Sequence, residues 1–185
     1  MLKRSVITIA IIGMLSFAIM FAGCTGTNTS PGSATTPVKS SAGPTKAPEL
    51  VVPATVPGFT LVLKYDHEEP IFQDEEYLSE GLYKPDQNST YEGSVAYLAI
   101  DVDKFVNSTA AGGIYDIING TAVSSSGHAG KYNYDAETGT ASIVLLQSDL
   151  IIASTAQAPD NVTAFNENLL RDASLKGMDA VISNF

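Results

Sequence analysis

The sequence predicts an α+β fold, in which a mostly antiparallel sheet is packed by two helices. Three observations lead to this prediction. Several short segments alternate apolar and polar residues or concentrate apolar ones, as strands do. Two other segments carry apolar residues at helical spacing. Only a few turn residues connect each of the last four strands to the next, so neighbouring strands would pair antiparallel. An N-terminal signal or membrane helix and a disordered stalk are predicted to precede this domain.

The first strand of the domain is predicted over residues 59–65, and the longest over residues 93–102. In the first, one face carries every second residue, namely Phe59, Leu61, Leu63 and Tyr65. The second has apolar residues on both faces, which is typical of a central strand covered on both sides. Between them, residues 66–80 read as an acidic segment with a few shorter apolar contacts, and residues 85–88 as a turn.

Asn107 is predicted to cap a helix that runs to Ile118. Gly112 and Gly113 weaken this helix, and we expect them to allow close packing against the sheet. Four strands follow, and a closing helix is predicted at the end of the chain. Their expected ranges are 122–127, 130–135, 140–147 and 150–156 for the strands, and 165–182 for the helix.

The N-terminus reads as an export signal. Lys3 and Arg4 precede a nearly uncharged apolar run that ends in Phe21-Ala22-Gly23-Cys24. Small residues directly before a cysteine resemble the lipobox of prokaryotic lipoproteins. That resemblance implies removal of residues 1–23 and lipid modification of Cys24, the only cysteine in the chain. If it is not cleaved, the run is long enough to cross a bilayer, so both alternatives place the remaining chain outside the cell.

Residues 24–57 are predicted to form a disordered linker. From Thr25 to Pro57, 11 of 33 residues are Ser or Thr, six are Pro, and none is aromatic. Such a composition buries too little apolar surface to offset the entropy lost on ordering. The linker would separate the membrane from a globular domain predicted over residues 58–185.

The domain is strongly acidic. After Gly58, 19 Asp and Glu face six Lys and Arg, a balance of −13. This charge repels phosphates, and we therefore expect no nucleic-acid partner. The predicted partner is the membrane, through the lipid on Cys24 or an uncleaved helix, at the extracellular face of the cell membrane. An envelope protein or a small ligand held between helix and sheet is a further predicted partner.

Five asparagines stand in Asn-X-Ser/Thr sequences, more than chance placement would give. We take them as glycosylation candidates: Asn28, Asn88, Asn107, Asn119 and Asn161. Together with the lipobox, they resemble the surface lipoproteins of archaea. A bacterial source, in which the sequences would be accidental, is the alternative.

No catalytic, metal or cofactor site is predicted. The densest acidic cluster, which includes Asp66, Asp74 and Glu75, fits no calcium loop and reads as a solvated loop. His67 and His128, the only histidines, have no spacing suited to zinc. Residues 124–126, all serine, read as the exposed end of a strand, without a nucleophile elbow. No glycine-rich phosphate loop is present.

In the order of its elements, the domain loosely resembles the PsbP-like α/β/α sandwiches, a similarity that carries no functional residue across. We therefore predict a lipid-anchored surface protein with a non-catalytic binding or envelope-organising role. One alternative is a small extracytoplasmic enzyme or enzyme accessory that uses His128 or His67 with carboxylates. Another is a structural coat component.

Overall fold

One antiparallel sheet of eight strands, in the order β1-β2-β3-β4-β8-β7-β6-β5, dominates the structure. The computed structural model describes residues 52–67, 72–162 and 164–184. Its strands are β1 (Thr55–Val56), β2 (Phe59–His67), β3 (Glu75–Pro85), β4 (Tyr97–Phe105), β5 (Thr121–Ser125), β6 (His128–Asp135), β7 (Thr140–Gln147) and β8 (Leu150–Gln157). The helices are α2 (Ser108–Ile117) and α3 (Glu167–Ile182). The predicted α+β class, with a mostly antiparallel sheet and two helices, is confirmed.

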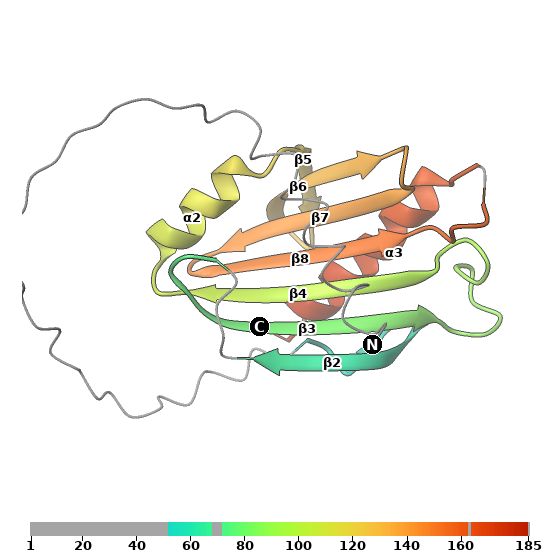
Figure 1. Cartoon of the computed structure of the whole chain (residues 1–185), viewed down its shortest axis with the longest axis horizontal. Coiled ribbons are helices and arrows are strands. Elements are labelled where there is room, and N and C mark those ends of the chain that lie inside the picture. Colours follow the sequence, from blue (N-terminus) through green and yellow to red (C-terminus); the bar gives the residue numbers. More distant parts are fainter. Residues whose placement is uncertain (1–51, 68–71, 163, 185) are drawn as a thin grey trace, which may run out of the picture. The chain divides into compact units, whose positions relative to one another are not determined.

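The two helices lie on opposite faces of the sheet. Figure 1 shows α3 behind the sheet, while α2 lies at one end. Helix α3 packs on the main core, to which β4 contributes Leu98, Ile100 and Val102. Helix α2 packs on the other face, over a smaller cluster that contains Phe105 and Ile151. Because alternate residues of a strand face opposite sides, each long strand contributes to both layers.

Strand β4 is central, as predicted, because it pairs with β3 on one side and with β8 on the other. Its range differs from the predicted 93–102. The backbone N–H groups of Ser94 and Val95 both donate to the carbonyl of Tyr91, which forms a turn there instead of a strand. Val95 nevertheless lies in the main core.

The prediction that Phe59, Leu61, Leu63 and Tyr65 share one face is wrong. The register of β2 against β3 shifts between Leu61 and Leu63, where a β-bulge inserts an extra residue. Phe59 and Leu61 therefore pack on the main core, whereas Leu63 and Tyr65 point to the other face. Strict alternation in a sequence cannot reveal a bulge, because the extra residue is defined only by the partner strand.

The acidic segment at 66–80 contains the first part of a strand that is not predicted from the sequence. Residues from Glu75 onward form β3, the longest strand of the sheet, which pairs along its length with β2 and β4. Glu75 is only 5% exposed, so it does not belong to a solvated loop. Acidic residues have low strand propensity, and here pairing on both sides overrides it.

Asn107 caps α2 as predicted, since its side-chain oxygen accepts from the Ala110 N–H at 2.9 Å. The expected packing role of Gly112 and Gly113 is wrong, because a Cβ at either position would meet nothing within 4 Å. The close helix–sheet approach occurs in α3, where a Cβ on Gly177 would overlap the Ser154 hydroxyl.

The folded part begins earlier than the predicted boundary at residue 58. Val52 and Val56 are each 2% exposed and belong to the main core. The Tyr83 hydroxyl donates to the Pro53 carbonyl at 2.5 Å, which fixes the chain beneath β3. Apolar burial therefore extends into a segment whose composition resembles the linker. The predicted signal sequence, Cys24 and the rest of the linker lie outside the described residues.

Candidate functional site

Of the two histidines, only His128 has a described side chain. His128 is exposed at the start of β6, opposite Ser125 of β5. No His, Cys, Asp or Glu cluster in residues 52–66, 72–162 and 164–184 has an arrangement suited to a metal ion. The side chain of His67, and Glu68 and Glu69 beside it, lie outside the described part of the chain.

Four of the five glycosylation candidates are described, and all four are exposed. They are Asn88, Asn107, Asn119 and Asn161, and Asn28 lies outside the described residues. Asn88 adopts a left-handed backbone conformation, with φ of 64°, in the connection between β3 and β4. Asn107 uses its side-chain oxygen to cap α2, whereas a glycan would be attached to its nitrogen. Capping therefore does not occupy the atom to be modified.

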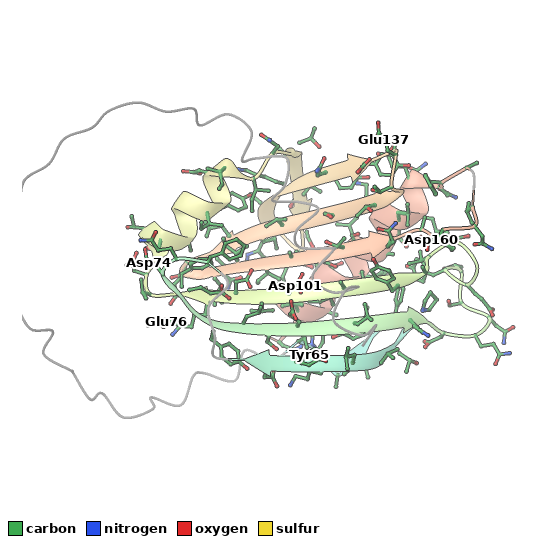
Figure 2. All side chains as sticks on the ribbon, viewed as in Figure 1. Tyr65, Asp74, Glu76, Asp101, Glu137 and Asp160 are labelled. Carbon is green, nitrogen blue, oxygen red and sulfur yellow. The ribbon has the colours of Figure 1, made fainter. Side chains whose placement is uncertain are left out.

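Carboxylates gather on the sheet face opposite α3. Glu80 of β3 lies directly opposite Asp101 of β4, and Asp103 follows two residues later on the same face. We call these three residues the carboxylate row. Figure 2 shows Asp101 near the middle of the sheet. Asp103 and Glu80 are each 8% exposed. On β8, the residues opposite the two aspartates are the apolar Ala153 and Ile151.

Burial raises the pKa of Asp101 to about 8, and the nearby charge of Glu80 acts in the same direction. Burial likewise raises the pKa of Asp103 well above its usual value, with added contributions from Asp101, Glu75 and Glu80. A raised pKa favours the protonated form of both aspartates, which lessens the cost of placing several like charges together in the sheet. Raised carboxyl pKa values of this kind occur in functional sites and also in purely structural clusters.

The carboxylate row is not among the sites predicted from the sequence. Asp101 and Asp103 alternate with apolar residues of a central strand, a pattern that indicates side chains on a covered face of the sheet. In the structure Asp103 is buried and Asp101 is half-buried. The sequence does not predict the position of Glu80, because it predicts no strand within residues 66–80.

An open groove lies between the start of the domain and the C-terminal end of α3. Its volume is about 510 Å³, and it is open to solvent along one side. Residues 53–57 contribute one wall with Pro53, Ala54, Thr55 and Pro57, and α3 and the residues after it contribute Lys176, Asp179, Ala180, Ser183 and Asn184. The groove therefore combines small apolar surface with one cation and one anion.

Two serines hold the anion of this groove in place. The hydroxyl groups of Ser125 and Ser126 donate to Asp179 Oδ1 at 2.6 and 2.8 Å. Ser125 is 3% exposed, so the expectation that residues 124–126 form an exposed strand end is wrong for this residue. Its burial depends on α3, which packs over the end of β5.

Comparisons with known proteins give no further guide: no family model matches the chain, and searches of curated proteins and of solved structures found no match. Among the helices of the described residues, none is long and apolar enough to cross a membrane.

Proposed function

We propose that this chain is an exported lipoprotein, attached to the outer face of the cell membrane through Cys24, whose domain binds a partner outside the cell. The observation that carries the proposal is the apolar N-terminal run that ends in Phe21-Ala22-Gly23-Cys24. The composition of the following linker, the acidity of the domain and the exposure of four Asn-X-Ser/Thr asparagines support it.

The anchor is tested by intact-mass analysis of the protein extracted from membranes. We expect loss of residues 1–23 and an added lipid mass on Cys24. A Cys24→Ala variant should then keep residues 1–23 or lack the lipid. Recovery of the wild-type chain with Met1 present and Cys24 unmodified would instead indicate an uncleaved membrane helix.

We further propose that the groove beside α3 is the binding site for this partner. It adjoins residues 53–57, where the chain enters the domain, and it presents Lys176 and a fixed Asp179 beside apolar surface. A peptide or small ligand that carries both charges fits this lining. The proposed role is non-catalytic binding, and a coat component would have no need of such a groove.

The groove can be tested with a photoreactive amino acid placed at single positions of the membrane-bound protein. Ser183 lines the groove, and Asn168 is another exposed position near the other end of α3. We expect a discrete cross-linked product from position 183 and none from position 168. Equal products from both positions would show that the groove has no special role.

A further inference from the structure

The outer edge of β2 is open over most of its length. Strand β1 pairs only with Phe59 and Thr60, and within the described part of the chain no other strand lies on that side of β2. Figure 1 shows β2 along one margin of the sheet. Backbone N–H and C=O groups along such an edge are a template for an added strand.

Residues 52–54, the described part of the chain before β1, do not continue along this edge. At Pro53 the chain turns beneath the sheet, where its carbonyl accepts from Tyr83 and Val52 is buried in the main core. A proline also lacks the N–H that an added strand would use. The bulge between Leu61 and Leu63 distorts the first part of the edge, which leaves the segment from Leu63 to the end of β2 for pairing.

This edge is also apolar for a surface strand. Val62 and Tyr65 are 51% and 47% exposed, and they are two of the four large apolar side chains that are exposed in the described structure. The opposite edge strand, β5, has mostly small or hydroxyl-bearing side chains. Burial of Tyr65, which lies within the segment left for pairing, would therefore be favourable.

The charges on the open segment are self-complementary. Lys64 and Asp66 flank Tyr65, and the ammonium group of Lys64 lies 2.9 Å from a carboxylate oxygen of Asp66. If two such strands pair antiparallel with Tyr65 opposite Tyr65, each Lys64 lies opposite the Asp66 of the other copy. Opposite charges at facing positions stabilise a strand pair, and the interface has the two-fold symmetry that is usual for dimers.

We propose that β2 is a dimerisation surface, at which two copies of this chain pair antiparallel about a two-fold axis through Tyr65. The two eight-stranded sheets then join into one continuous sheet. This inference goes beyond the proposed binding function and does not depend on the lipid anchor or on the groove.

A disulfide trap tests the register in the full chain, expressed with its own N-terminal segment and kept in membranes. Facing residues of antiparallel strands have Cα atoms about 4.5–5.5 Å apart, which suits a disulfide. Tyr65→Cys should therefore give a covalent dimer on mild oxidation. Val62→Cys is the matched control, because it has similar exposure but would lie about 20 Å from its counterpart in this register.

The wild-type chain serves as the background control, because it reports any covalent dimer formed through Cys24. Only the dimer that the Tyr65→Cys chain forms in excess of this background is counted. A strong covalent dimer at position 65, with little at position 62, supports the proposal. Equal dimers at both positions would indicate random collision, and no added dimer at either position would show that β2 does not self-associate. A cross-link to a different protein would assign the edge to another partner. Each of the last three results overturns the proposal.

A charge-reversal experiment tests the pairing without cysteines. Lys64→Asp and Asp66→Lys chains, each with its own affinity tag, would both repel their own copies. When they are produced together, the introduced aspartate faces the introduced lysine at one end of the pair, and the native Asp66 faces the native Lys64 at the other. We expect about tenfold more co-purification in the mixture than for either variant with itself, because the interactions of both facing charge pairs change from repulsive to attractive.

Far-UV circular dichroism of both variants controls for misfolding, since Asp66 also accepts a hydrogen bond from Ser79. Equal co-purification in homotypic and mixed samples, with both variants folded, would refute the proposed register.

Discussion

Replacement of Asp101 by Asn should stabilise the protein at neutral and alkaline pH. Asn has nearly the same shape as a protonated Asp but cannot ionise. Burial and the charge of Glu80 raise the pKa of Asp101 from 3.8 to about 8 in the folded protein. The folded state therefore binds the proton more tightly than the unfolded state does, and stability is lost as pH rises from about 4 to about 8.

The magnitude follows from this shift. Each unit of pKa difference corresponds to about 1.4 kcal/mol, so the shift of Asp101 sets an upper bound of about 5 kcal/mol between pH 4 and pH 8. Water penetration and relaxation of the strands reduce this value, and we expect about 2–4 kcal/mol. The Asn variant should match the wild type near pH 4 and exceed its unfolding free energy by this amount at pH 8.

Urea unfolding followed by far-UV circular dichroism, at intervals from pH 4 to pH 9, measures the difference. The chain has no Trp, so circular dichroism is preferable to fluorescence. Asp116→Asn, at an exposed position of α2, is the control and should show no comparable pH dependence. Greater destabilisation of the Asp101 variant at pH 8 than at pH 4 would contradict the prediction, because Asp101 would then be ionised and favourably paired.

Three further outcomes follow from local geometry. Gly177→Ala should lower the unfolding free energy by about 1–3 kcal/mol, because the added methyl overlaps Ser154. Gly113→Ala has open space around it and should raise the unfolding free energy by up to about 1 kcal/mol. Thermal unfolding compares the two variants, and equal effects would contradict these packing differences. Asn107→Ala should lower the unfolding free energy by about 1 kcal/mol, whereas Asn107→Asp should change it little, because Asp also caps helices. Similar losses for the two variants in urea unfolding would exclude a capping role. Ser174→Ala should lower the unfolding free energy by about 1–3 kcal/mol, because the buried Ser174 hydroxyl donates to backbone carbonyls and accepts from the Ala156 N–H. An unchanged unfolding free energy would show that these hydrogen bonds are readily replaced.

The order and type of most elements followed from the sequence, because the signals involved are local. Asn107 lies one residue before the first turn of α2 and caps it. The predicted strand at 140–147 matches β7, since turn residues bound it on both sides. Apolar residues on both faces identified β4 as central, because only a strand covered on both sides accommodates them.

Tertiary pairing alone decided the other features. The bulge in β2 moved Leu63 and Tyr65 to the face opposite Phe59, and a bulge exists only relative to a partner strand. Glu75 and Glu80 became part of a strand because β2 and β4 satisfy the backbone of β3 from both sides. The carboxylate row arose in the same way, since the pairing of β3 with β4 places Glu80 opposite Asp101. A sequence specifies which residues alternate along a strand, but only the register between strands determines which charges meet.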